Sequence, residues 1–514
     1  MFSVKKGLFL VAVIFAITGI SCSKLEDENK DPNSISITEE HPDMLLTHSI
    51  EELGDLIFDV WLGHEIGSCW VQHMAKVQYT DEDRYVPRND VINDIWTTLY
   101  AGPGIEIQRI IDIAKKNGHD NYQGVALVLK VYLFSVLTDL YGDIPYSEAF
   151  KPDSTLTPKY DTQESIYSNF MQALELANTL LKNDGQVVDG DILFDGDIVK
   201  WKRFANSLRL RLLLRMSNKM DAQSLKSAIS SIVNNPTTYP IFQSNSDNAA
   251  LHYLGTTPNN NPLNETYKTR DDHRVSKTLV DAMYNPNKPD HPDWRIMVYA
   301  DVPDAGGYWT GLPNGLTSAK AAAYNGNGFT GTSRIGSYFI QPEAPGMFMS
   351  YAELQFLLAE VAYKDLLEGV SSADAQTFYE NGIRASYYQF QDEILEKAPE
   401  FYSQFNGVVL NIDDFINDFL ANDGAWNQVS GLQKIAKQKW IAMFDQGVQA
   451  WFEWRRTGLP VLVPAEDGLN NGKIPIRLRY PSDEYSRNDE QLNVALTRMS
   501  GSDDLNTPVW WNEH

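Results

Sequence analysis

Three residues that commonly ligate metals lie close together in the sequence: His64, Cys69 and His73, five and four residues apart. His64 and Glu65 begin the zinc-protease pattern, in which a second histidine stands four residues after the first. Ser68 occupies that position here, and the spacing fits none of the usual structural zinc sites. We therefore predict no metal site, and we expect Cys69 to be a buried free thiol.

Paired carboxylates would indicate acid–base chemistry, and Asp139 and Asp143 are the clearest pair. They stand where a long apolar stretch gives way to Gly142 and Pro145, which favours roles in helix ends and turns. Residues 189–197, DGDILFDGD, are also acidic. Apolar residues fill positions where a calcium loop needs oxygen ligands, so we expect this segment to lead into a helix.

Other catalytic patterns are absent or incomplete. Gly326–Gly331 matches the glycine spacing of dinucleotide-binding folds, but no apolar strand precedes it and no helix follows directly. The chain has no nucleophile elbow and no phosphate-binding loop. We predict no catalytic residue and no cofactor. A surface glycoside hydrolase stays open as an alternative, because its two carboxylates can be far apart in the sequence.

The composition bounds the class of protein. The chain has 514 residues, 43% of them hydrophobic and 22% charged, with a formal net charge of −25. These proportions are typical of a globular protein with a large core. A strongly acidic surface disfavours nucleic acid, whose phosphates need a basic footprint. We therefore predict no nucleic-acid partner.

The N-terminus has the layout of a bacterial lipoprotein signal. Lys5 and Lys6 precede the apolar run Gly7–Ile20, which is too short for an ordinary transmembrane span. Cleavage would remove residues 1–21 and leave Cys22 to carry lipid.

Two further features qualify this signal. Gly19 stands three residues before the cysteine, where such signals usually carry leucine, so secretion with an unmodified cysteine is the alternative. Residues 22–40 are polar and charged, and they are expected to form a tether.

Helical periodicity dominates the rest of the chain, which predicts an all-α fold. Residues 122–141 are apolar on nearly every side, as in a helix at the centre of a bundle. Ser350 with Glu353, and Asp161 with Glu164, have the spacing of a capping box. We expect helices over residues 40–75 (interrupted by Gly63 and Gly67), 91–100, 105–116, 122–141, 161–181, 201–215, 276–284, 350–369, 371–386, 415–420, 432–444 and 448–456.

Residues 236–346 break this periodicity. Asparagine, glycine, proline and tyrosine become frequent there, as in TTPNNNPLNE and GGYWTGLPNG. Long irregular segments within a compact protein are usually functional or disordered. The aromatic residues argue against disorder, so we expect an ordered, loop-rich region.

Several stretches resemble the SusD/RagB family of outer-membrane nutrient-binding lipoproteins, in its SusD-like branch. The most telling is residues 431–460, GLQKIAKQKWIAMFDQGVQAWFEWRRTGLP. Others are CWVQHMAKVQYTDEDRY (69–85), TDLYGDIPYSEAF (138–150), WKRFANSLRLRLLLR (201–215), SYAELQFLLAEVAY (350–363), KIPIRLRYPSDEYSRN (473–488) and TPVWWNEH (507–514). They occur in the family's order between Cys22 and His514.

The resemblance implies one SusD-like domain over residues 41–514. Tetratricopeptide-like helical hairpins would form a curved scaffold, and a loop-rich variable region, residues 236–346, would lie on it. Such proteins are held at the cell surface of the outer membrane by the N-terminal lipid. They bind glycans and deliver them to a SusC-like TonB-dependent transporter without cleaving them. A RagB-like oligopeptide-binding protein and a purely structural lipoprotein are the alternatives.

A glycan site needs flat aromatic rings beside a few polar groups, and loops on a rigid scaffold are the usual place for it. Two stretches fit, with core packing as the alternative for each residue and the favoured one for the second stretch. The predicted ligand-binding residues are Trp309, Tyr308, Tyr324 and Phe329 in the loop-rich region, and Trp70, Gln72, Tyr79 and Arg84 in the early segment.

The first prediction concerns the anchor. Replacing Cys22 by Ala removes the lipid attachment point, so the mature protein should leave the outer-membrane fraction, because several acyl chains bind far more firmly than one. Cell fractionation and labelling with a fatty-acid analogue measure this. Unchanged membrane association, with no label on the unsubstituted protein, would contradict the lipoprotein assignment.

Overall fold

A helix that is buried on nearly every side runs through the centre of the fold. The computed structural model describes residues 41–151, 156–402, 405 and 407–513, so Cys22 and the tether lie outside the described residues. Residues 43–514 form one compact unit, within which the fold is described. The central helix is α6 (Asp120–Tyr141). It is long and apolar enough to cross a membrane, but 94% of its apolar window is buried inside the protein. The prediction of a bundle helix is confirmed.

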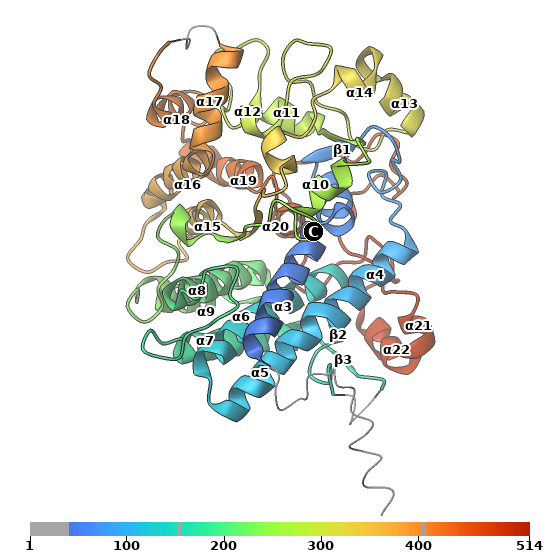
Figure 1. Cartoon of the computed structure of the whole chain (residues 1–514), viewed down its shortest axis with the longest axis vertical. Coiled ribbons are helices and arrows are strands. Elements are labelled where there is room, and N and C mark those ends of the chain that lie inside the picture. The colour runs from blue at the N-terminus through green and yellow to red at the C-terminus, as the bar shows by residue number, and fades with distance from the viewer. Residues whose placement is uncertain (1–40, 152–155, 403–404, 406, 514) are drawn as a thin grey trace, which may run out of the picture. The chain divides into compact units, whose positions relative to one another are not determined.

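Consecutive helices pack as hairpins around α6. α5 (Ile105–Asn117) and α7 (Gln163–Leu180) both pack against α6, and α8 (Ile198–Arg215) and α9 (Ala222–Val233) follow α7 in order. α15 (Tyr351–Tyr363) packs along α16 (Ala375–Gln389), and α19 (Gly431–Ala442) lies against both. Figure 1 shows the α5–α9 group in the lower part and the α15, α16 and α19 group above it. The predicted all-α, helical-hairpin architecture is confirmed.

The remaining helices are shorter or flank this scaffold. They are α3 (Pro42–Ile57), α4 (Asn89–Leu99), α10 (Pro262–Tyr267), α11 (Lys277–Met283), α12 (Ile296–Tyr299), α13 (Ser318–Ala323), α14 (Gly328–Gly331), α17 (Gln391–Phe401), α18 (Ile412–Ala421), α20 (Gly447–Thr457), α21 (Glu484–Arg487) and α22 (Asp489–Arg498), with the π-helices η1 (Val60–Ser68) and η2 (Tyr100–Gly104) and the 3₁₀ turns η3 (Ser217–Lys219), η4 (Asn245–Asp247), η5 (Tyr324–Gly326), η6 (Ser337–Ile340), η7 (Ser372–Asp374) and η9 (Gln428–Ser430).

Short antiparallel ribbons fasten the loop-rich region to the helices. β1 (Met74–Lys76) pairs with β5 (His273–Val275), with Met74 opposite Val275. β4 (Ala249–Leu251) pairs with β6 (Gly346–Met349). A third ribbon, β2 (Ile144–Pro145) with β3 (Tyr160–Asp161), closes the segment after α6. Residues 236–346 are therefore ordered around short helices and strands.

The helix ends show which of the predicted capping residues are used. Ser350 caps α15 by accepting a hydrogen bond from the Glu353 backbone N–H, at 3.1 Å. The prediction of Asp161 as the cap of α7 is wrong, because Thr162 caps that helix and accepts from Ser165 N–H. The Asp161 carboxylate instead accepts from Ser147, across the turn. Asp161 and Thr162 are adjacent, and both residue types can cap a helix. Because Asp161 is engaged by Ser147, Thr162 serves as the cap.

The C-terminal helix pair folds as its sequence predicts. α19 and α20 are separated by a turn that ends at Gly447, and Gly458 adopts a left-handed conformation (φ 65°) just after α20. A side chain at Gly447 would collide with Ser68 and with the Gly63 carbonyl of η1. The glycine is needed because η1 and α20 pack backbone to backbone.

Asp139 is a structural hub. Its buried carboxylate accepts from the Tyr167 hydroxyl and the Trp511 indole N–H, both at 2.6 Å, and forms an ion pair with Arg215 at 2.6 Å. Its backbone carbonyl accepts from Arg455 at 2.7 Å. The Asp139 carboxylate therefore joins α6 to α7, α8 and the C-terminal segment, and its backbone carbonyl joins α6 to α20.

The second prediction concerns this hub. Asp139→Asn leaves the Arg215 guanidinium buried without a counter-charge, so we expect a loss of about 3–5 kcal/mol in the free energy of unfolding. The matched control is Asp143→Asn in the same segment. Asp143 pairs with the partly exposed Arg498 at 2.6 Å, so its loss should be about 1 kcal/mol or less. Urea unfolding followed by circular dichroism measures both, and equal losses would contradict the assigned role.

Candidate ligand-binding groove

Trp309 and Tyr308 lie on the segment between α12 and α13, and they differ in exposure. The Trp309 side chain is 3% exposed. Its indole N–H donates to the Ala300 carbonyl at 2.8 Å, and its ring packs against Tyr284 and Phe401, with centroids 5.4 and 5.0 Å apart. The expectation of an exposed Trp309 platform is wrong, because these partners enclose the ring. Tyr308 is 53% exposed and stacks on Tyr284.

Trp70 and Gln72 are also enclosed. The Trp70 indole N–H donates to the Glu82 carbonyl at 2.8 Å, and its ring meets Trp451 edge to face, with centroids 5.0 Å apart. The Gln72 amide accepts from the Thr278 hydroxyl at 2.7 Å and donates to the Val463 carbonyl. Both side chains are buried, which corresponds to the core-packing alternative and leaves no face for a ligand.

The other predicted aromatic residues lie in the segment after β1 (Tyr79), in η5 (Tyr324) and in α14 (Phe329). Tyr79 is 64% exposed, with the Arg270 guanidinium 5.9 Å from its ring centroid. Tyr324 and Phe329 are partly buried and pack on a small apolar cluster formed by Ala75, Val77, Leu312, Leu316 and Ala321.

Arg84 contributes differently from the rings. Its guanidinium Nε donates to the Asp467 carbonyl at 3.1 Å and so holds a C-terminal loop. Nearby, Asp83 accepts from Gly315 N–H at 2.8 Å. The early segment and the 314–329 segment therefore meet, and of the predicted aromatic rings Tyr79 and Tyr308 are exposed.

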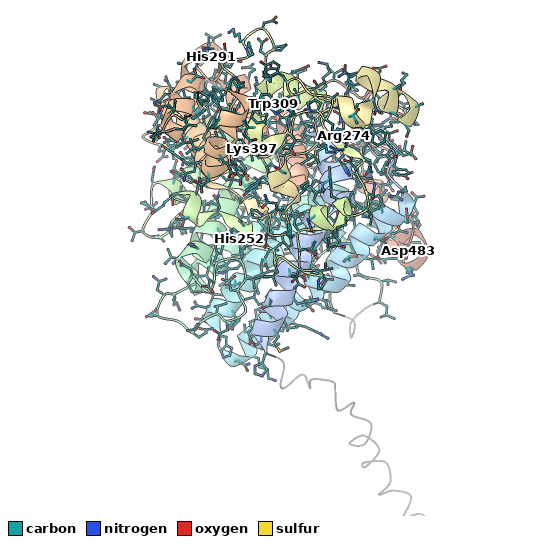
Figure 2. All side chains as sticks on the ribbon, turned by 45° about the horizontal axis from the view of Figure 1, so that its top comes forward. His252, Arg274, His291, Trp309, Lys397 and Asp483 are labelled. Carbon is teal, nitrogen blue, oxygen red and sulfur yellow. The ribbon has the colours of Figure 1, made fainter. Side chains whose placement is uncertain are left out.

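The structure also contains a groove that the sequence analysis missed. A cleft of about 700 Å³ is lined by residues 191–195 before α8, by η4 and β4, by Tyr338 and β6, and by the end of α16. None of the predicted residues lines this cleft. Figure 2 shows His252 of its wall near the middle of the protein and Trp309 toward the upper edge. Four segments that are distant in the sequence form the cleft, and no single motif marks it.

The walls of this groove combine aromatic rings with amides. Tyr388 is 39% exposed, and its hydroxyl donates to the Asp413 carboxylate at 2.6 Å, which fixes the ring. Tyr338 stands perpendicular to Phe390, with centroids 5.5 Å apart. The Asn245 amide donates to the Ala385 carbonyl at 2.8 Å. Its side-chain oxygen is buried without a hydrogen-bond partner among the described residues.

The charged groups that line the groove differ in how fully the fold engages them by hydrogen bonds. Asp191 is committed to the fold: its two oxygens accept from three backbone N–H groups and from the Trp201 indole, the latter at 2.6 Å. Asp195 and Lys200 also line the groove. Asp191 is thus held by the turn just before α8, and the prediction that residues 189–197 lead into a helix is confirmed.

A second section continues the groove along α3. It has a volume of about 420 Å³ and includes Met44, Thr47 and His48, with the exposed Leu254 on the opposite wall. Ile192 and His252 line both sections. The two sections form one groove that passes from a polar, tyrosine-lined end to a more apolar end.

The sequence's candidate metal ligands do not share a site. His73 Nε2 lies 2.9 Å from the Trp440 carbonyl oxygen, and burial lowers the pKa of His73 to about 3. Cys69 is a buried free cysteine, as predicted, and burial raises the pKa of its thiol. His64 turns to the Asp59 carbonyl, at 2.8 Å. All three side chains are thus buried, and each histidine lies within hydrogen-bond distance of a backbone carbonyl oxygen.

Comparisons with known proteins identify the family. The SusD-like family, described as starch-binding and associating with the outer membrane, matches residues 32–481. The chain belongs to this SusD-like family, which confirms the resemblance drawn from the motifs. No curated protein matches the chain.

Solved structures share the fold over nearly the whole chain. A chitin-binding protein is 28% identical, with a TM-score of 0.76 over 92% of this chain and 100% of its own. A SusD homologue from Bacteroides uniformis is 26% identical, with a TM-score of 0.74 over 91% and 99% of the two chains. A chitin-binding SusD homologue from Flavobacterium johnsoniae, 23% identical, has a TM-score of 0.73 over 92% and 98%.

The third prediction compares the loss of a buried ring with the loss of an exposed ring in the loop-rich region. Trp309→Ala removes an enclosed indole and should cost about 3–5 kcal/mol of unfolding free energy. Tyr308→Ala, at the next position, removes an exposed ring and should change stability by about 0.5 kcal/mol or less. Parallel urea titrations measure both variants. A stable Trp309→Ala protein would contradict the core role assigned to this indole.

Proposed function

We propose that the protein is a cell-surface lipoprotein of the outer membrane that binds glycans and delivers them to a SusC-like TonB-dependent transporter. Membership of a family described as starch-binding and outer-membrane-associated supports the ligand class and the location. The chitin-binding protein of the same fold supports a glycan ligand as well. The lipid would be attached at Cys22, outside the described residues.

The observation that carries the proposal is the groove with its two tyrosine rings. Sugar rings have apolar C–H faces that pack on flat aromatics and hydroxyl edges that need hydrogen-bond partners. Tyr338 and Tyr388 supply the rings, and Asn245, Gln389 and His252 supply polar groups beside them. A cleft of about 700 Å³ is in the size range of small-molecule sites, roughly 300–1,000 Å³. The more apolar second section gives a longer ligand room to continue.

We propose binding without cleavage, and the state of the carboxylates in the polar section supports this. Glycoside hydrolysis needs two carboxyl groups free to face the scissile bond. Two aspartates line the polar section. Backbone N–H groups and the Trp201 indole occupy both oxygens of Asp191, so Asp195 is the one aspartate of this section that could face a ligand. The groove thus favours retention of an intact glycan, which suits a protein that hands its ligand to a transporter.

Tyr79 and Tyr308 extend the proposal to a second surface. Both rings are exposed, so a long glycan or the transporter itself would have access to them. We propose them as auxiliary contacts, outside the groove.

The fourth prediction tests the groove. Tyr388→Ala removes a ring from its wall, so the affinity for the cognate oligosaccharide should fall about tenfold or more, equivalent to about 1.4 kcal/mol. Tyr388→Phe keeps the ring and should retain most of the affinity. Isothermal titration calorimetry against starch, chitin and other oligosaccharides, with a peptide set beside them, measures this.

The matched control is Tyr485→Ala on α21. Tyr485 is 46% exposed, and its hydroxyl donates to Asp503 at 2.9 Å, much as that of Tyr388 does to Asp413. It does not line the groove, so its loss should leave the affinity unchanged. Equal affinity in the Tyr388→Ala protein would place the ligand elsewhere. Binding of peptides alone would favour the RagB-like alternative, and release of cleaved sugar would favour a hydrolase.

A further inference from the structure

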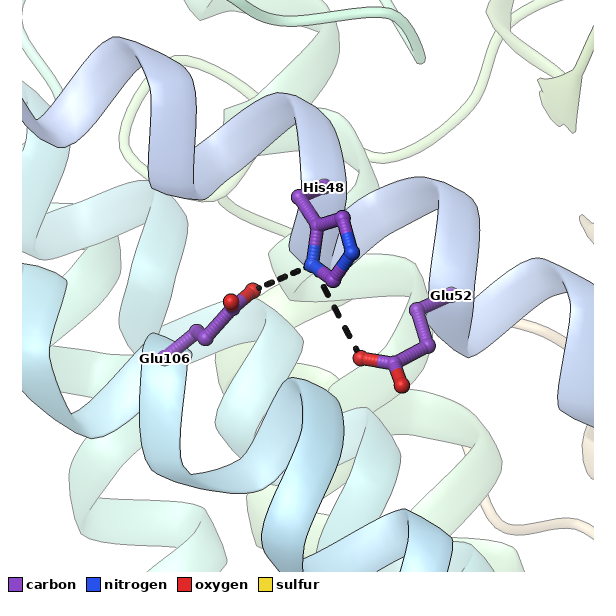
Figure 3. A group of neighbouring side chains, drawn as sticks. All are labelled: His48, Glu52 and Glu106. Atoms are coloured by element: carbon purple, nitrogen blue, oxygen red, sulfur yellow. Dashed lines mark hydrogen bonds and ion pairs between the residues drawn. The ribbon is translucent and has the colours of Figure 1, made fainter. Parts of the chain in front are cut away.

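Two helices near the start of the folded unit bring a histidine and two glutamates together. His48 and Glu52 lie one turn apart on α3, and Glu106 is in the first turn of α5. Figure 3 shows the three side chains converging from the two helices. His48 Nδ1 lies 2.9 Å from Glu106 Oε2 and 3.8 Å from Glu52 Oε2. One potential ligand atom from each residue lies within 4.8 Å of the others.

The surroundings fix the carboxylates in place. The Ser49 hydroxyl of α3 donates to the Leu45 carbonyl at 2.6 Å and lies 3.2 Å from Glu106 Oε2 on α5. A side chain at Gly102 would collide with the Glu52 carboxylate, so the glycine leaves the space that this carboxylate fills. Partners that orient ligands in this way are typical of built metal sites.

The negative charge of this cluster is not balanced. Among the described residues, neither Glu52 nor Glu106 pairs with a lysine or an arginine; their ion-pair partner is His48. Glu52 Oε2 is buried and has no hydrogen-bond donor in the described part of the chain. Glu51, on the same helix, adds further negative charge beside the cluster. A cation between the three groups would relieve this imbalance.

We propose that His48, Glu52 and Glu106 form a binding site for a divalent transition-metal ion of the Zn²⁺ type. Imidazole nitrogen suits Zn²⁺ and its neighbours in the first transition row, whereas Ca²⁺ and Mg²⁺ take oxygen ligands. Three protein ligands with one position left to solvent is a common zinc arrangement. The 2.9 Å separation between His48 and Glu106 is a hydrogen-bond distance, and the ion takes the place of the bridging proton. His48 is about half exposed, so its ring is free to turn toward the ion.

The site has a structural consequence that does not rest on glycan binding. An ion held by His48 and Glu52 on one helix and Glu106 on the other cross-links α3 to α5. α3 is the first helix of the folded unit after the proposed tether. Because the ion binds the folded chain and the two helices separate on unfolding, binding should raise the melting temperature. His48 also lines the second section of the groove, so the ion would stand at its rim.

The fifth prediction tests the site with the tag-free mature protein and ZnCl₂ alone. Calorimetric titration should show one Zn²⁺ bound per chain, with a rise in melting temperature that EDTA reverses. His48→Ala and Glu106→Gln should each weaken Zn²⁺ binding at least tenfold and abolish the thermal shift. Circular dichroism of the metal-free proteins checks that both variants fold.

The matched control is His291→Ala. His291 forms an exposed pair with Asp418 at 2.7 Å, and no second carboxylate completes a metal-ligating group there among the described residues. This variant should bind Zn²⁺ as the parent does. Unchanged Zn²⁺ affinity in the His48→Ala protein would overturn the proposal, as would an equal loss in the His291→Ala protein. Ca²⁺ binding with the same affinity and no dependence on His48 would overturn the choice of metal class.

Discussion

The fold depends on a backbone-to-backbone contact between η1, near the start of the described chain, and α20, which lies almost 400 residues later. A Cβ at Gly67 would lie 2.5 Å from the Val448 backbone nitrogen, and Gly447 is equally confined by η1. Only glycine allows such an approach. Because β1 follows directly after η1 and pairs with β5, this contact sets where the loop-rich region joins the helices. The Asp139 hub then joins α6 to the C-terminal segment.

Much of the scaffold was predictable from the sequence. α6 was predicted because its apolar residues leave no polar face, and such a helix is stable only inside a bundle. The sequence predicted that the helix beginning at residue 448 ends at residue 456, and in the structure Gly458 adopts the left-handed conformation just after α20. These features are local, and local propensity and tertiary packing agree at them.

The candidate site was less predictable, for physical reasons. A tryptophan in a loop with polar neighbours fits a binding platform and a core anchor equally well, and for Trp309 the choice depends on Tyr284 and Phe401, which are distant in the sequence. The groove itself is formed by residues from α3, β4, β6 and α16. Asn245 and Tyr388 carry no motif that would join them. The His48–Glu52 spacing was visible, but Glu106 joins it only through the packing of α3 beside α5.

We propose that the glycan binds in the groove, and not on the surface around Tyr79 and Tyr308. Hydrogen–deuterium exchange with and without the cognate oligosaccharide tests this directly, because bound ligand slows exchange in the segments that it covers. If the glycan binds in the groove, protection should be concentrated in residues 245–252, 338–347 and 385–390. Protection confined to residues 77–85 and 308–329, with no change along the groove, would contradict it.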